Sequence, residues 1–318
     1  MSSPQIEIIH ADVTTVDADV LVLKYARAFH GADRAIASLI PQLNKGLKLT
    51  EGQHAAFDGG LRIRPSQVLF LGVTDLRHFD YAAIREFGRD AILLVAKQYP
   101  GARTVAMTIH GVGYGLDERE AFNAQVAGIL EAIESRQTGQ IQSIRITERN
   151  PNRVERLAAL LRIIVTPPSI QQTAPRNKLS TTIDAGISSE AKRHVFVAMP
   201  FGKDMSDVYD FGIKEPVNEA GLLCERVDMT VFTGDILHRI KERIDTASLI
   251  IADLTGANPN VYLEVGYAWG RARPTLLIAR KGDELKFDVR TQRCILYDTI
   301  GELRQHMCAN LLELTSGT

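Results

Sequence analysis

Glu264 has the residue type and the surroundings expected of a reactive carboxylate. It lies in the stretch 251–270, IADLTGANPNVYLEVGYAWG, which is predicted to run from a buried strand through a tight loop into a helix. One apolar stripe of this helix should face a sheet, and it comprises Val261, Val265, Ala268 and Trp269. Glu264 falls at the edge of that stripe, so partial desolvation should make its carboxylate more reactive. An ordinary surface glutamate is the alternative interpretation.

The loop before this helix has residues suited to start it. Asn258 is predicted as the N-cap and Pro259 as the first helical residue. Arg226 and Asp228, at the end of another predicted strand, either bind phosphate or stabilise the fold. Gly234 and Asp235 open a further helix, whose N-terminus either holds an anion or is simply capped.

The elements around Glu264 alternate regularly between strand and helix. Strands are predicted at 194–200, 222–228, 249–254, 275–280 and 293–298, and helices at 208–220, 234–247, 259–270 and in a segment that ends near Leu314. This pattern predicts a flavodoxin-like, doubly wound parallel sheet with strand order 2-1-3-4-5. Ligands of such sheets bind outside the carboxyl ends of strands one and three, which here places a site at the loops 199–202 and 253–256.

The N-terminal half is predicted to be a mixed α/β domain, with a parallel or mixed sheet covered on both faces. Its strands are predicted at 6–13, 18–25, 67–73, 104–110 and 141–149, and its helices at 32–43, 81–98, 117–135 and 152–164. Residues 166–190 are rich in Pro, Gln, Ser and Thr and show no periodicity. We therefore expect two domains, 1–165 and 191–318, joined by a linker at 166–190.

Composition excludes several classes of function. The 318 residues include 37 Lys and Arg against 38 Asp and Glu, so broad nucleic-acid or membrane-surface binding is not expected. The three cysteines, Cys224, Cys294 and Cys308, have no metal-ligand spacing, and no metal or disulfide framework is expected. We expect no signal peptide and no membrane span, and hence a cytoplasmic location.

Three blocks of the C-terminal half resemble the nucleoside 2-deoxyribosyltransferase superfamily, in particular its TIR-like bacterial branch. The blocks are VFVAMPFG, GDILHRIKERIDTASLIIADLTG and NPNVYLEVGYAWGRARPTLLI, and the resemblance covers about 193–297. It implies that Glu264 is the catalytic residue that attacks or stabilises the anomeric carbon of a sugar. Cleavage of a ribosyl–base bond passes through an oxocarbenium-like state, which a nearby carboxylate stabilises or bonds to.

The resemblance also implies roles for the residues around the switch point. A nicotinamide leaving group needs no protonation, whereas a purine needs a proton donor, for which Asp253 is the candidate. The alternative for Asp253 is to order the loop. The substrate-binding residues are expected to be Met199, Pro200, Phe201, Gly202, Arg226, Asp228, Thr255, Gly256, Asn258 and Asn260.

Two departures from the superfamily argue against exchange of bases between deoxynucleosides. Asn258 stands where these enzymes usually carry an aspartate, and Met199, Pro200 and Phe201 stand where an aromatic hydroxyl is usual. We therefore expect cleavage or transfer of the N-ribosyl bond of another nucleotide, with NAD or a related nucleotide as substrate and no cofactor. The alternatives are a non-catalytic nucleotide-binding receptor or scaffold, and a genuine nucleoside 2-deoxyribosyltransferase.

The N-terminal half resembles the macro-like N-terminal domain of leucyl aminopeptidases over about 6–134. The segments concerned are HADVTTVDADVLVLKYA, QVLFLGVTD and HGVGYGLDEREAFNA. The resemblance implies a nucleotide-like ligand, with Asp12 near an adenine and the backbone of Gly111, Gly113 and Gly115 around phosphates. A glycine-rich turn is the alternative interpretation. A TIR-like effector joined to such a sensing or assembly domain is typical of bacterial antiphage defence, and homo-oligomerisation is expected.

Overall fold

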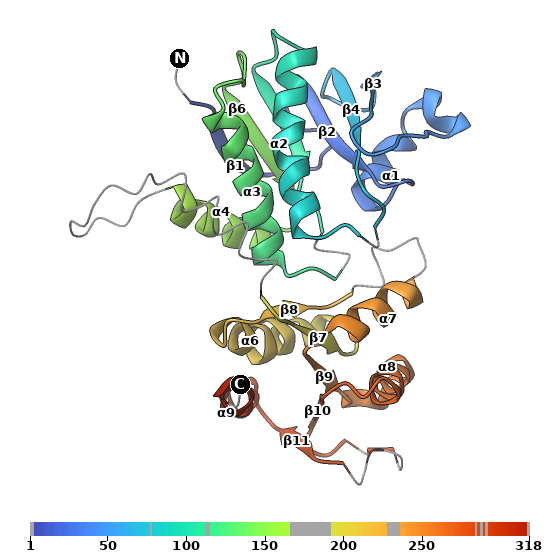
Figure 1. Cartoon of the computed structure of the whole chain (residues 1–318), viewed down its shortest axis with the longest axis vertical. Helices are drawn as coiled ribbons and strands as arrows, with labels where there is room; N and C mark the ends of the chain where they lie inside the picture. Colours follow the sequence, from blue (N-terminus) through green and yellow to red (C-terminus); the bar gives the residue numbers. More distant parts are fainter. Residues whose placement is uncertain are drawn as a thin grey trace, which may run out of the picture. The chain divides into compact units, whose positions relative to one another are not determined.

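The structure is a computed structural model that describes residues 3–76, 78–111, 115–165, 192–227, 236–283, 285–286, 289 and 292–316. It divides into two compact units (Figure 1). The first contains Met1–Val112 and Glu118–Glu190, and the second contains Gly113–Asp117 and Ala191–Thr318. The predicted linker at 166–190 lies outside the described residues. Among the described residues, no helix is long and apolar enough to cross a bilayer.

The second unit is built on a five-stranded, all-parallel sheet. Its strands are β7 (His194–Ala198), β8 (Leu223–Glu225), β9 (Leu249–Asp253), β10 (Thr275–Arg280) and β11 (Cys294–Tyr297). They lie in the order β11-β10-β9-β7-β8, which confirms the predicted order 2-1-3-4-5. The carboxyl ends of β7 and β9 therefore meet at the topological switch point, as the sequence predicts.

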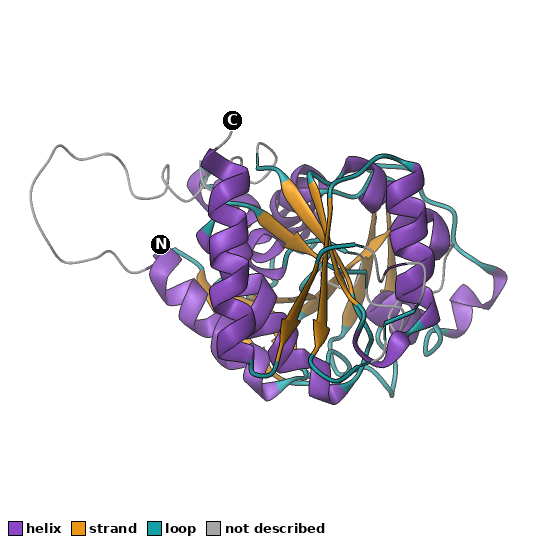
Figure 2. Ribbon diagram, turned by 90° about the horizontal axis from the view of Figure 1, so that it is seen from below, coloured by secondary structure: helices purple, strands orange, loops and turns teal. Residues whose placement is uncertain are grey.

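Helices cover both faces of this sheet because the central strands bury side chains on both sides. Val195, Val197 and Met199 pack beneath η4 (Val208–Lys214), α6 (Glu215–Glu219) and α9 (Ile300–Ser316). Phe196 and Ala198 pack beneath α7 (Ile236–Thr246) and α8 (Pro259–Gly270). Figure 2 shows the strands enclosed between helices. The short 3-10 turns η3 (Lys203–Met205) and η5 (Thr255–Ala257) follow β7 and β9.

The helix predicted at 208–220 forms, but its first part, η4, is a π-helix. Gly212 lies at a close contact within it, because a Cβ there would be 2.7 Å from Cδ2 of Leu303 on α9. The hydrophobic periodicity predicts a helix but does not distinguish the π form from the α form. π-Helical segments are rare in proteins, and many of those that do occur lie at functional sites.

The first unit contains a six-stranded mixed sheet, as predicted. Its strands are β1 (Gln5–His10), β2 (Val20–Tyr25), β3 (His54–Asp58), β4 (Gln67–Gly72), β5 (Thr104–Thr108) and β6 (Ser143–Glu148), in the order β1-β6-β5-β2-β4-β3. All neighbouring pairs are parallel except β3 and β4. The sequence analysis missed β3, because this short edge strand alternates only between exposed and half-buried residues.

The helices of the first unit are α1 (Gly31–Ala37), η1 (Pro41–Lys45), α2 (Tyr81–Gln98), α3 (Glu118–Glu134) and α4 (Pro151–Val165). Figure 1 shows α2 and α3 side by side over the sheet. Two glycines permit this close packing, since a Cβ on Gly88 would lie 2.4 Å from the Gln125 carbonyl oxygen and one on Gly128 would lie 1.9 Å from the Arg85 carbonyl oxygen. α1 packs on the sheet face that carries Leu21.

A buried ion pair joins β2 to α1. Lys24 and Asp33 are each 2% exposed, and the Lys24 ammonium donates to the Asp33 carboxylate. Asp33 accepts through Oδ2, whereas Oδ1 has no hydrogen-bond partner in the part of the chain that the structure describes. The attraction between two buried charges offsets little more than the free energy of removing them from water. Either charge alone in this position would be strongly destabilising.

Candidate active site

α8 positions Glu264 much as the sequence predicts. Asn258 caps the helix, with its Oδ1 accepting a hydrogen bond from the Asn260 amide at 2.9 Å, and Pro259 occupies the first position. The helix buries Val261, Val265 and Ala268 against the sheet. Glu264 follows the helix start by five residues, a rise of about 8 Å along the helix axis.

Trp269 was predicted to belong to the same stripe, and that prediction is wrong. Its side chain is 37% exposed. At about 100° per residue, Trp269 lies about 80° around the helix from Val261, whereas Ala268 lies only about 20° away. Trp269 is also the penultimate residue of α8, where the helix reaches its end.

The carboxyl group of Glu264 is half-buried and has no polar partner among the described residues. Burial raises its pKa from the ordinary 4.5 to about 7. Within the described part of the chain, no residue donates a hydrogen bond or forms an ion pair with it. The carboxylate is therefore held in a low-dielectric environment with its lone pairs free, which suits a group that must stabilise or bond to a developing cation.

Asp253 has a different environment. It is fully buried, its Oδ1 accepts from the Thr255 amide at 2.9 Å, and its Oδ2 accepts from the Tyr297 hydroxyl at 2.9 Å. Burial raises the pKa of its carboxyl group, and these hydrogen bonds oppose the rise. Oδ1 thus orders the loop after β9, and Oδ2 joins β9 to Tyr297 of β11. Proton donation to a leaving group would require one of these bonds to open.

The residues after β9 use their polar groups within the loop. The Thr255 hydroxyl accepts from the Arg280 amide at 3.1 Å, and the Gly256 amide donates to Asp283 Oδ2 at 2.9 Å. Gly256 has φ +69°, a left-handed conformation that favours glycine. Asn260 is exposed on the first turn of α8. Most of this loop is therefore ordered by its own hydrogen bonds.

At the carboxyl ends of β7 and β8, aromatic rings surround the Arg226 guanidinium. Its Cζ lies 4.1 Å from the Tyr209 ring centroid and 5.4 Å from that of Phe201, and its Nη1 lies 3.4 Å from the Met199 sulfur. No carboxylate among the described residues pairs with Arg226. A half-buried guanidinium held by aromatic faces keeps its donor edge available to an anion.

The structure brings together three of the predicted substrate-binding residues, Met199, Phe201 and Arg226, and adds Tyr209. The sequence analysis missed Tyr209, since nothing in the spacing shows that η4 places its ring beneath Arg226. Burial raises the Tyr209 pKa well above its ordinary value, so the hydroxyl stays protonated. It donates to the Cys224 carbonyl oxygen at 3.5 Å.

Pro200 is half-buried and Gly202 is exposed beside Phe201. Asp228, Gly234 and Asp235 lie outside the described residues.

The predicted N-terminal ligand residues lie on loops at the carboxyl ends of β1 and β5. Asp12 Oδ1 accepts from the Thr14 hydroxyl at 2.6 Å and from the Thr14 amide at 2.9 Å, and these bonds lower its pKa. Gly111 and Gly115 have φ +89° and +98°, which glycine alone adopts readily. Gly113 lies outside the described residues, and Gly115 groups with the second unit.

The described residues contain no group of three or more His, Cys, Asp or Glu side chains arranged to hold a metal ion. No hydrogen-bonded nucleophile–base pair of the Ser–His or Cys–His type occurs among them either. The two groups left for chemistry in this unit are the Glu264 carboxylate on α8 and the Arg226 guanidinium after β8, neither of which has a charged partner among the described residues.

Comparison with known proteins finds similarity to solved structures of macrodomains. No protein family and no curated protein sequence matches the chain. Among solved structures, the Oceanobacillus iheyensis macrodomain with ADP is 16% identical, covers 51% of this chain and 93% of its own, and has a TM-score of 0.42. A Trypanosoma brucei macrodomain in complex with ADP is 15% identical, with coverages of 49% and 67% and a TM-score of 0.41. The macro domain of ganglioside induced differentiation associated protein 2 is 13% identical, with coverages of 49% and 83% and a TM-score of 0.38.

The chain thus combines a half built on a mixed sheet with a second half built on an all-parallel sheet. These comparisons leave the resemblance to the deoxyribosyltransferase superfamily as an inference from the sequence.

Proposed function

We propose that the second unit cleaves or transfers an N-ribosyl bond, with NAD or a related nucleotide as substrate and Glu264 as the catalytic carboxylate. The observation that carries the proposal is the Glu264 carboxyl group, which is desolvated and lacks a partner among the described residues. It lies on the helix that follows the switch-point strand β9. Structural carboxylates of this unit, such as Asp253, are satisfied by hydrogen bonds.

The chemistry follows from the charge that develops on the sugar. As the bond between C1′ and the base breaks, its electron pair leaves with the base and C1′ becomes cationic. Ionised Glu264 either stabilises that cation or bonds to it. Water or another acceptor then takes the ribosyl group. With nicotinamide the departing ring nitrogen needs no proton, so both Asp253 oxygens remain in their hydrogen bonds.

The substrate is bound, in this proposal, by the cluster of Met199, Phe201, Tyr209 and Arg226. The Arg226 guanidinium receives a phosphate oxygen, because its fork matches phosphate geometry and it has no competing carboxylate among the described residues. Phosphate binding at Arg226 favours a nucleotide over an unphosphorylated nucleoside, and hence NAD cleavage over deoxynucleoside exchange.

The proposal extends to the context in which the enzyme acts. The first unit senses a nucleotide-like signal or mediates homo-oligomer assembly, and the whole protein is a cytoplasmic effector of antiphage defence. This part rests on the sequence resemblances alone.

The test is to incubate the full chain with NAD and to quantify nicotinamide and ADP-ribose by liquid chromatography. We expect product from the native protein and a loss of at least a hundredfold in Glu264→Gln. Glu134→Gln is the matched control, because Glu134 is an exposed glutamate at the end of α3. Equal activity in Glu264→Gln refutes the catalytic assignment. Retention of intact nucleotide without product would instead identify a receptor, and base exchange between deoxynucleosides a deoxyribosyltransferase.

A further inference from the structure

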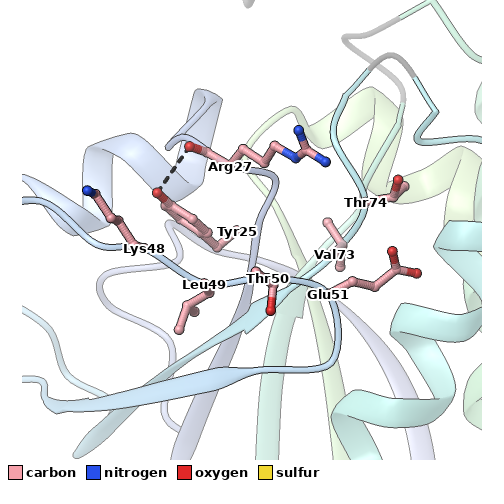
Figure 3. Close-up of a pocket in the computed structure, with 8 residues that line it drawn as sticks. All are labelled: Tyr25, Arg27, Lys48, Leu49, Thr50, Glu51, Val73 and Thr74. Carbon is pink, nitrogen blue, oxygen red and sulfur yellow. Dashed lines mark hydrogen bonds between the residues drawn. The ribbon is translucent and has the colours of Figure 1, made fainter.

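The first unit contains a pocket of about 380 Å³ at the carboxyl ends of the parallel strands β2 and β4 (Figure 3). This volume is within the range of small-molecule sites, and carboxyl strand ends are where open α/β sheets bind ligands. Tyr25, Leu49 and Val73 supply its apolar surface. The residues predicted to bind a nucleotide in this unit, Asp12 and Gly111 among them, do not line it.

One wall of the pocket is fixed by backbone hydrogen bonds. The turn at 50–53 closes with the Gln53 amide donating to the Thr50 carbonyl oxygen at 3.1 Å, and the Gly72 amide donates to the Gln53 carbonyl oxygen at 2.7 Å. A Cβ on Gly72 would lie 2.1 Å from the Thr50 carbonyl oxygen, so only glycine permits this approach. The turn that carries Glu51 is therefore held against the end of β4.

The opposite wall carries an arginine in a strained conformation. Arg27 has φ +58°, the left-handed region that is unfavourable for residues with a Cβ. The buried Tyr25 hydroxyl donates to the Arg27 carbonyl oxygen at 3.1 Å. It also contacts the Leu47 carbonyl oxygen. Burial raises the Tyr25 pKa, so the hydroxyl remains a donor. Strain of this kind persists where the surrounding structure imposes it, and it clusters at ligand sites.

The charges around the pocket balance. Arg27 and Lys48 are positive, Glu51 is negative, and Asp75 Oδ2 lies 3.9 Å from Arg27 Nη2. Figure 3 shows the Arg27 and Glu51 side chains reaching toward the same side of the pocket, whereas the Lys48 ammonium points the other way. Arg27 and Glu51, one positive and one negative group on the same side of the pocket, favour a ligand with separated charges and no net charge over a phosphate dianion.

We propose that this pocket binds an α-amino acid with an apolar or aromatic side chain. The Arg27 fork receives the α-carboxylate, since guanidinium geometry matches a carboxylate bidentately. Glu51 accepts from the α-ammonium group. Tyr25, Leu49 and Val73 contact the side chain and supply the hydrophobic contribution. The site is independent of the catalysis proposed for the second unit.

The experiment measures binding of L-phenylalanine to the full chain by isothermal titration calorimetry and ligand-observed NMR. N-acetyl-L-phenylalanine lacks the ammonium group, L-phenylalaninamide lacks the carboxylate, and phenyl phosphate carries a dianion instead. We expect L-phenylalanine to bind at least tenfold more tightly than any of the three. Tighter binding of phenyl phosphate, or no binding of L-phenylalanine at millimolar concentration, overturns the proposal.

The variants Arg27→Gly and Arg136→Gly separate binding from folding. Arg136 also has a left-handed backbone, with φ +57°, and lies in the exposed turn after α3 and outside the pocket. Both variants lose one guanidinium and relieve one strained residue, so neither should lower the thermal midpoint. We expect Arg27→Gly and Glu51→Gln to weaken L-phenylalanine binding at least tenfold and Arg136→Gly to leave it unchanged. Equal binding by Arg27→Gly and Arg136→Gly refutes the assignment.

Discussion

Replacement of Glu264 by glutamine should stabilise the second unit at alkaline pH while it removes the proposed activity. The native pKa is raised from 4.5 to about 7 by burial. Between these values the folded protein binds more protons than the unfolded chain, so the free energy of unfolding falls as pH rises. One pKa unit corresponds to about 1.4 kcal/mol, so the difference between the unfolded and folded pKa values lowers the free energy of unfolding by about 3 kcal/mol by pH 8. This is an upper limit, because Glu264 is partly exposed to solvent.

Trp269, the single tryptophan of the chain, provides the assay. It lies on α8, the helix that carries Glu264, so its fluorescence during urea unfolding reports on the second unit. We expect Glu264→Gln and the native protein to have similar unfolding free energies at pH 4.5. At pH 8 the unfolding free energy of the variant should exceed that of the native protein by about 1–3 kcal/mol, a range that allows for solvent screening.

The exposed control Glu134→Gln should show no difference that depends on pH. The reasoning is refuted if Glu264→Gln is equal to or less stable than the native protein at pH 8. It is also refuted if the variant differs from the native protein by the same amount at both pH values, because the cause would then be packing and not ionisation.

Three further predictions concern the pH profile, the substrate site and the buried ion pair. Because the ionised form of Glu264 is the active one, kcat/KM for NAD should rise with pH through about 7 and level off above it. Tyr209→Leu should remove the ring beneath Arg226 and raise the KM for NAD by about 3- to 30-fold, with kcat little changed, since a cation–π contact contributes about 0.5–2 kcal/mol. An equal fall in kcat would contradict a binding role. Lys24→Met should lower the unfolding free energy of the first unit by about 3–5 kcal/mol, because Asp33 is left charged and buried. The double variant Lys24→Met/Asp33→Leu should recover most of that loss in calorimetry, and failure to recover it would show that packing matters more than charge.

The elements of the second unit could be predicted closely because their sequence patterns are strong. β10 and α8 have the predicted bounds, 275–280 and 259–270. Strands buried on both faces appear as continuous apolar runs, and the Asn–Pro pair marks a helix start by local chemistry alone. β3 gave no such signal, since an edge strand with one pairing partner needs few buried side chains.

The candidate site was predictable only where it depends on position along one element. Glu264 could be placed at the edge of an apolar stripe because helical geometry fixes the angle between neighbouring side chains. Tyr209 could not be found from the sequence, because it lies on the π-helix η4 after β7, whereas Arg226 follows β8. Only the tertiary fold brings the Tyr209 ring to the Arg226 guanidinium. The same holds for Arg27, whose carbonyl oxygen accepts from the Tyr25 hydroxyl, which also contacts the Leu47 carbonyl oxygen from a distant part of the chain.

The sequence by itself determined the order of strands and helices in the second unit, its all-parallel sheet and the place of Glu264 on its helix. These follow from local propensity and hydrophobic periodicity, which act over a few residues. Only the tertiary structure decided which polar groups are satisfied. It binds both oxygens of Asp253 and leaves Glu264 without a partner among the described residues. Desolvation depends on atoms brought close from distant parts of the chain, and it is desolvation that raises the pKa of one carboxyl group to about 7.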